Sequence, residues 1–166
     1  MIQKNPLVQL IRKIEKKDIP DIKEILERSN NFNAEEIECA LDLINIYFND
    51  PSQKDYEFLC CEHDNRVIGY TCYGPTPLTK GTFDLYWICV GPEFHNLGIG
   101  ARLLMEAEKS ILDSNGRIVI VETSSQEKYL SVVSFYKRNK YSVAAVIKDF
   151  YCEGDSKIIF LKRLIP

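Results

Sequence analysis

The segment HNLGIGAR (residues 95–102) places Gly98 and Gly100 where an apolar run gives way to a helical pattern. The run before it, FDLYWICV, is typical of a strand, and ARLLMEAEKSIL has the spacing of an amphipathic helix. The first turn of a helix has unpaired N–H groups and a partial positive charge, and glycine lets the backbone approach an anion closely. The segment therefore predicts a phosphate-binding loop, in which the amides of residues 96–101 face a pyrophosphate.

The glycine pair has other interpretations. A dinucleotide fingerprint, G-x-G-x-x-G, would need a third glycine where Leu103 stands. A Walker loop would need a Gly-Lys-Ser/Thr ending, which this segment lacks. A simple tight turn at Gly98 stays open as a purely structural alternative, because Gly-x-Gly alone is a weak signal.

The length and composition are those of an ordinary globular protein. The chain has 166 residues, 45% hydrophobic and 27% charged, which suits a single domain over residues 1–166. The formal net charge of −3 argues against nucleic acid as the main partner. No apolar run approaches the roughly 20 residues of a membrane span, and charges interrupt the N-terminal apolar stretch. We therefore expect a cytoplasmic protein without a signal peptide or a membrane partner.

The cysteines and histidines do not predict a metal site. There is no C-x-x-C pair, and neither His63 nor His95 has ligand spacing to a cysteine cluster. Most of the cysteines stand inside apolar strand-like runs, so we interpret them as small buried residues in a reducing compartment. The six are Cys39, Cys60, Cys61, Cys72, Cys89 and Cys152.

Hydrophobic periodicity predicts the order β-α-α-β-β-β-α-β-α-β-β, a mixed α/β sheet with helices on its faces. Asp18 is expected to cap the first helix, and Asn33 with Glu36 forms a capping-box pattern before the second. The strands are expected at 8–14, 56–62, 66–74, 82–90 and 117–123, with a closing hairpin around EGDS (153–156), and later helices near 98–113 and 127–138.

The segment VGPEFHNLGIGARLL (90–104) resembles the acyl-CoA-binding motif of the GNAT superfamily of N-acyltransferases, which it matches at Val90, Pro92, Gly98, Gly100 and Leu103. It departs from that motif at His95, where the family usually has Arg or Gln. A histidine can still donate to phosphate, more weakly when neutral, so tighter binding at lower pH is expected.

A second stretch, SFYKRNKY (134–141), resembles the helix that follows in the family. Lys140 stands where the family usually has glycine, so the turn is expected to use Asn139. The order of elements from 8 to 164 also resembles the family. The resemblance implies the GNAT fold, a central mixed, mostly antiparallel sheet of about seven strands flanked by about four helices.

The resemblance also implies acetyl-CoA as co-substrate. Main-chain groups of Ile88 and Val90 would pair with its pantetheine arm, and an N–H near Ile88 or Cys89 would polarise the thioester carbonyl. The residues expected to bind it are Ile88, Cys89, Val90, His95, Asn96, Leu97, Gly98, Ile99, Gly100 and Ala101.

Tyr136 matches the position of the family's general acid, with packing beside Phe135 as the structural alternative. Asp84 is the expected general base, Glu122 is the second candidate, and a water chain would suffice for many amines. An acyl-thiol route through Cys89 is disfavoured, because nothing nearby clearly activates this thiol.

The acceptor is expected among the first two helices, the loop 74–81 and the last hairpin, and a cationic amine could be attracted there by Asp149, Glu153 and Asp155. These acids are explained equally by a polar hairpin tip. The candidate lining residues are Tyr47, Phe48, Tyr73, Tyr86, Tyr129, Phe150 and Tyr151.

The expected function is acetyl transfer by direct attack of a primary amine, on a small molecule or a peptide, in a protein whose organisation as a homodimer is left open. A non-catalytic acyl-CoA-binding or sensing module is the alternative. A modifier of protein N-termini or lysines is a third interpretation.

Overall fold

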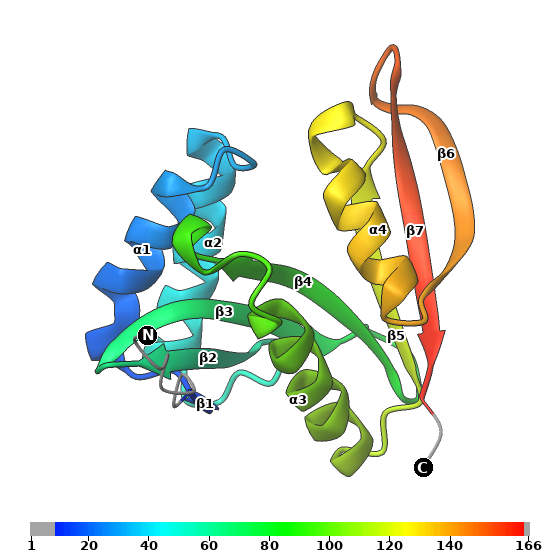
Figure 1. Ribbon diagram of the computed structural model, residues 1–166. Coiled ribbons are helices and arrows are strands. Elements are labelled where there is room, and N and C mark those ends of the chain that lie inside the picture. Colours follow the sequence, from blue (N-terminus) through cyan, green and yellow to red (C-terminus); the bar gives the residue numbers. More distant parts are fainter. Residues whose placement is uncertain (1–8, 165–166) are drawn as a thin grey trace, which may run out of the picture. The chain divides into compact units, whose positions relative to one another are not determined.

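The computed structural model describes residues 9–164, so residue 8 of the predicted first strand lies outside it (Figure 1). The order of strands and helices is the predicted one. The elements are β1 (Leu10–Lys13), α1 (Ile19–Arg28), α2 (Ala34–Asn49), β2 (Glu57–His63), β3 (Arg66–Pro75), β4 (Thr82–Val90), α3 (Ile99–Asp113), β5 (Ile118–Ser124), α4 (Leu130–Arg138), β6 (Ser142–Cys152) and β7 (Asp155–Arg163).

The strands form one sheet in the order β1-β2-β3-β4-β5-β7-β6. β1 with β2, β5 with β7 and β7 with β6 are antiparallel, whereas β4 and β5 are parallel, which confirms the predicted mixed sheet. Contacts divide the chain into two compact units. The first unit holds the residues up to Cys72 together with Trp87–Ala107, and the second holds Tyr73–Tyr86 together with the residues from Glu108 onward.

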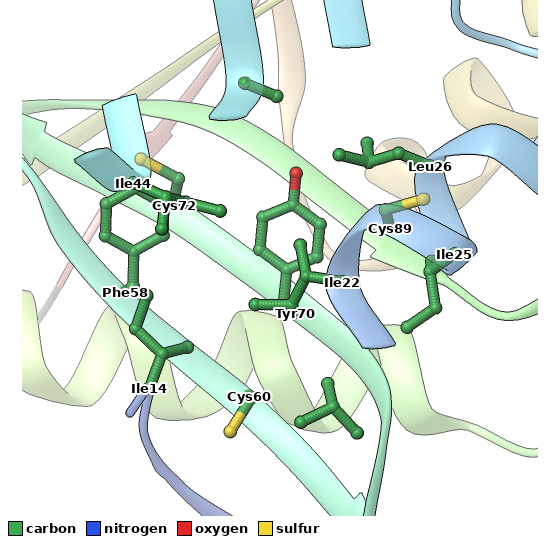
Figure 2. Close-up of a cluster of buried hydrophobic side chains, with 12 residues drawn as sticks. Ile14, Ile22, Ile25, Leu26, Ile44, Phe58, Cys60, Tyr70, Cys72 and Cys89 are labelled. Carbon is green, nitrogen blue, oxygen red and sulfur yellow. The ribbon is translucent and has the colours of Figure 1, made fainter. Parts of the chain in front are cut away.

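In the first unit, apolar side chains cover both faces of the strands. α1 and α2 bury Ile22, Leu26 and Ile44 against β2 and β3, as Figure 2 shows around Tyr70. Cys61 belongs to a second cluster, which contains the start of α3, whereas its neighbour Cys60 belongs to the first. Successive side chains of a strand point to opposite faces of the sheet. Since Cys60 packs with α1 and α2 and Cys61 with the start of α3, these helices cover opposite faces of the strands in this unit.

In the second unit, α4 packs on the antiparallel hairpin of β6 and β7 (Figure 1). β6 is the last strand of the sheet and is exposed along all of its 11 residues. Ile147 of β6 faces Lys157 of β7 and Cys152 faces Asp155, so residues 148–151 bulge out opposite Ser156 alone. This bulge carries Phe150 and Tyr151, and the Lys157 ammonium lies 3.9 Å from the centre of the Phe150 ring.

The N-termini of α1 and α2 test the capping predictions. The capping box before α2 is confirmed, since Asn33 and Glu36 exchange backbone-to-side-chain hydrogen bonds of 2.8 and 2.9 Å. Asp18 occupies the N-cap position of α1, as predicted, but its side chain makes no capping bond: the carboxylate accepts from the Glu15 N–H and from both terminal nitrogens of Arg12. An arginine held on β1 offers a charge-assisted, two-pronged partner that the helix amides cannot match.

Two further expectations need correction. The turn after α4 does not use Asn139, whose φ is −89°; Lys140 itself adopts the left-handed conformation, with φ of 68°. The Tyr141 N–H bonds to the Tyr136 carbonyl, so the helix closes with lysine in the glycine position. Four of the six cysteines are buried, but Cys39 and Cys152 are exposed.

The pairing of Asp18 predicts a pH-dependent contribution to stability. Burial opposes ionisation of Asp18, but hydrogen bonds from Arg12 and the Glu15 N–H outweigh it and lower the pKa of the carboxyl. A lowered folded-state pKa stabilises the fold above the unfolded pKa, and this stabilisation is lost as the pH falls towards the folded value. Asp18→Asn should reduce the free energy of unfolding at pH 7 by about 1–3 kcal/mol. It should also flatten the acid limb of the stability curve below pH about 4.

Urea unfolding across a pH series measures both effects. The control is Glu57→Gln, which removes an exposed ion pair with Lys13 at 3.0 Å and should cost at most about 1 kcal/mol. The Asp18 side chain is 4% exposed and the Glu57 side chain 41%. Equal losses in the two variants would contradict a special role for the buried pair.

Candidate functional site

The loop between β4 and α3 has the backbone geometry of an anion site. After β4 ends, a single 3-10 turn (Pro92–Phe94) leads to Asn96 and Gly98, both with positive φ, of 62° and 78°. The first bond of α3 runs from the Arg102 N–H to the Gly98 carbonyl at 3.1 Å. The N–H groups of residues 99–101 therefore have no acceptor within the helix. The first turn of α3 contains no acidic residue that would compete with an anion for these groups.

Burial of two α3 side chains holds this helix start in place. Ile99 and Leu103 are both 0% exposed and pack with Cys61 and Ile68, and Val90 and Phe94 pack against the same cluster. At Gly98, an added Cβ would meet no atom within 4 Å. The backbone conformation, rather than crowding by the protein, is therefore what requires glycine there.

His95 makes a contact that its type did not predict. Its Nε2 lies 2.9 Å from the Val90 carbonyl oxygen, an acceptor, so Nε2 must carry a hydrogen. In the neutral ring Nδ1 is then an acceptor and cannot donate to phosphate. Protonation converts Nδ1 into a donor, so only the charged ring can donate to an anion while it keeps the Val90 bond.

The predicted residues of β4 lie on both faces of the strand. Cys89 is buried in the cluster under α1 and α2, whereas Val90 packs on the α3 side. Burial raises the pKa of the Cys89 thiol to about 11, against a smaller opposing effect of a hydrogen bond with Ser29. The thiol is therefore protonated at neutral pH, in agreement with its interpretation as a core cysteine.

Tyr136 lies in the second unit, on α4, in an aromatic cluster. Its ring centre is 5.2 Å from that of Phe135, 5.4 Å from that of Tyr141 and 5.8 Å from that of Phe160. Burial raises the pKa of its hydroxyl above the usual tyrosine value. The phenol therefore holds its proton at neutral pH, as a general acid must before it acts.

The two candidate bases, both in the second unit, have different partners. Asp84 accepts a hydrogen bond of 2.7 Å from the Thr76 hydroxyl. This partner is neutral, so the contact does not neutralise the charge of the carboxylate. The Glu122 carboxylate lies 2.6 Å from the Lys157 ammonium and is engaged in an ion pair. The contacts favour Asp84, whose partner here is a neutral hydroxyl. Sequence reasoning did not find Thr76, which stands in the Pro-rich loop and meets Asp84 only across the chain reversal.

The acidic hairpin residues have structural partners. Asp155, which is 6% exposed, accepts from the Ser124 hydroxyl at 2.5 Å and from the Gln126 amide at 2.9 Å. Asp149 accepts from the Gly154 N–H at 2.8 Å. These bonds favour the polar hairpin-tip interpretation for both residues. Over residues 9–164, no helix is long and apolar enough to cross a membrane, and no group of three or more potential metal ligands occurs.

Comparisons with known proteins agree on one family. A model of the family described as "Acetyltransferase (GNAT) family" matches residues 19–141. A crystal structure from Desulfovibrio desulfuricans, assigned to the GNAT family of acetyltransferases, is 35% identical with a TM-score of 0.91, covering 94% of this chain and 99% of its own. The PaiA N-acetyltransferase from Thermoplasma acidophilum, solved in complex with coenzyme A, is 23% identical with a TM-score of 0.75, covering 95% and 100% of the two chains.

A curated relative is the S-(2-succino)cysteine N-acetyltransferase of Bacillus subtilis (strain 168), which is 27% identical over 84 residues. That match covers 48% of this chain and spans about half, 51%, of the relative's length.

The loop geometry predicts opposite results for two substitutions at one position. Gly98→Val places a β-branched residue at φ of 78° and should weaken coenzyme A binding at least about tenfold, because the loop must rearrange. Gly98→Asn, whose side chain tolerates this conformation, should keep binding within about threefold. Both variants should fold, since the position is open. Titration calorimetry decides, and equal affinities would remove the Gly98 conformation from the binding site.

The His95 contact predicts pH-dependent binding. Because only the protonated imidazole can donate through Nδ1 while it keeps the Val90 bond, coenzyme A affinity should rise as the pH is lowered. His95→Arg keeps a permanent cation and should bind at least as tightly with a flatter profile, whereas His95→Ala has no donor and should bind weakly at low and high pH. A wild-type profile in His95→Ala would exclude His95 from the anion site.

Proposed function

Because the chain belongs to the GNAT family of acetyltransferases, we propose that it transfers an acetyl group from acetyl-CoA to a primary amine by direct attack. The observation that carries the proposal is the start of α3. Left-handed Asn96 and Gly98, a capping carbonyl at Gly98 and three N–H groups without helical acceptors together suit a pyrophosphate. We further propose that both units act as one catalytic domain over residues 1–166, in the cytoplasm.

The end of β4 is proposed to bind the pantetheine arm. Acetyl-CoA supplies an activated thioester, and the chain supplies main-chain groups of Ile88 and Val90 that pair with amides. The Val90 carbonyl already accepts from His95, and its second lone pair can accept another N–H. An N–H near Ile88 or Cys89 would stabilise the oxygen that becomes negative as the amine attacks.

Two proton movements complete the transfer. The amine nitrogen bonds to the carbonyl carbon and loses a proton to Asp84, directly or through water, while the carbon–sulfur bond breaks. Tyr136 donates its hydroxyl proton to the departing thiolate. A phenol has a pKa near 10 and a thiol about 8.5, so this donation is uphill and depends on placement. The raised pKa of Tyr136 makes the donation more demanding, which strengthens the need for contact with the sulfur.

The acceptor is proposed to be a small amine, with a peptide amine as the alternative. Support comes from the Bacillus subtilis relative, whose name gives S-(2-succino)cysteine, an amino acid derivative, as the substrate of N-acetylation. That relative matches over only half of its length, so the experiment must sample amines widely. Release of the coenzyme A thiol over a panel of amino acids, polyamines, aminoglycosides and peptides tests the proposal.

A non-catalytic acyl-CoA sensor is the second candidate. The observation in its favour is the aromatic packing of Tyr136, which gives this residue a structural reason to be present. A folded protein that binds acetyl-CoA and releases no thiol with any amine would support the sensor.

The Tyr136 hydroxyl separates the two candidates. Tyr136→Phe keeps the ring contacts and should lower kcat by roughly 10²–10⁴ with little change in acetyl-CoA affinity. The matched control is Tyr141→Phe, which removes a hydroxyl that donates to Glu108 at 2.9 Å and should affect stability more than kcat. Wild-type kcat in Tyr136→Phe would assign the proton transfer to water or another group.

A further inference from the structure

Three side chains of the second unit converge on the ammonium group of Lys157 in β7. The Nζ atom lies 2.6 Å from a carboxylate oxygen of Glu122 in β5. It also lies 3.9 Å from the centre of the Phe150 ring and 5.9 Å from that of the Tyr151 ring, both carried by β6. A carboxylate and aromatic ring faces are groups that bind an ammonium ion. The second unit therefore contains an ammonium site, which a lysine of the chain itself occupies.

The bulge of β6 makes this site possible. In a regular strand, the neighbouring residues 150 and 151 would point to opposite faces of the sheet. They belong instead to the bulge opposite Ser156, and both rings lie beside the same ammonium group. A bulge re-aims the side chains that it carries, so this irregularity brings two rings to Lys157.

The partners of the lysine are open to solvent, whereas the lysine is largely covered. The Lys157 side chain is 14% exposed and the Glu122 side chain 49%. Phe150 and Tyr151 are each 49% exposed. An acceptor molecule can therefore reach the carboxylate and both rings from solvent.

The site shares a face of the sheet with Asp84, the proposed base. Asp84 pairs with Ile120 of β5, and Glu122 follows Ile120 by two residues, so the two carboxylates point to the same face. Lys157 pairs with Ser124, a further two residues along β5, and points to that face as well. Asp84 and Glu122 are therefore about 7 Å apart in the strand direction, on neighbouring strands.

The occupied site restricts the choice of acceptor. Lys157 pairs with Glu122 and lies against the rings, so a second cation there would meet a like charge and find its partners engaged. We propose that Lys157 determines acceptor specificity by excluding amines that carry a second positive charge at the distance of Glu122 from Asp84. Amines with a neutral, apolar tail are admitted, because the tail packs on the exposed rings of Phe150 and Tyr151. This rests on the proposed function, in which Asp84 receives the proton of the attacking amine.

The first test compares two acceptors that differ in one charge, pentylamine and 1,5-diaminopentane. The wild type should turn over the diamine with the lower kcat/KM. Lys157→Met keeps the length of the side chain and removes its charge, so the ratio of kcat/KM for the diamine to that for the monoamine should rise by about 10–100-fold. Lys157→Arg keeps a cation and should retain the wild-type preference.

Two further variants locate the effect. Lys148→Met removes an exposed lysine of the same bulge and should keep the wild-type ratio. Adding Glu122→Gln to Lys157→Met should abolish the gain, because the diamine then loses its carboxylate partner. An unchanged ratio in Lys157→Met, or a wild type that prefers the diamine, overturns the proposal.

The second test needs no turnover. With Glu122 and the rings released, Lys157→Met and Lys157→Gln should gain thermal stability as 1,5-diaminopentane is titrated, by roughly 3–6 °C in Tm at about ten times the Kd. The wild type should show no such rise, and pentylamine should stabilise the variants less than the diamine does. The two substitutions separate loss of the charge from loss of packing by the side chain.

Failure of this proposal differs from failure of the proposed function. A diamine that stabilises neither variant overturns the ammonium site at Glu122 while acetyl transfer stands. Absence of thiol release with every amine contradicts the proposed function, and the Tm titration then still decides whether Lys157 occupies a site for ammonium.

Discussion

The complete burial of Ile99 and Leu103 is the constraint on which the loop depends. A helix end offers its N–H groups to an anion only if it cannot shift or unwind, and these two side chains fix the first turns of α3 against Cys61 and Ile68. The same cluster includes Val90 and Phe94, which bracket the start of the loop. The apolar core of the first unit thus fixes both the strand that precedes the loop and the helix that follows it.

The order of elements was predictable because it is a local property of the chain. Alternation in FDLYWICV, the period of ARLLMEAEKSIL and the Asn33–Glu36 box each depend on neighbouring residues, and each matches the structure. The left-handed Gly98 was predictable for the same reason. The family pattern around residues 90–104 then added the expected chemistry of the loop.

The predictions that failed or were missed depend on long-range partners. Asp18 is the N-cap residue of α1 in the structure as in the sequence, but its carboxylate bonds to Arg12, which also pairs with Glu62 of β2, and not to the helix amides. The hydrogen bond from His95 to the Val90 carbonyl and the one from Thr76 to Asp84 likewise follow from how the chain folds and not from a local sequence pattern. The wrong prediction at residues 139–140 has a different cause. The left-handed conformation favours glycine or asparagine over lysine, yet the turn after α4 places Lys140 in it.

The bulge in β6 has a consequence for solution behaviour. An edge strand with unpaired backbone groups and exposed apolar side chains is a template for strand addition by other chains, and Val143, Val146 and Ile147 are each more than 40% exposed. Residues 148–151 leave the ladder, and Asp149 takes a left-handed φ of 52°. The pairing also shifts between Val143 and Ala145, so β6 offers only short regular stretches to another strand, and this limits the growth of the sheet at its edge.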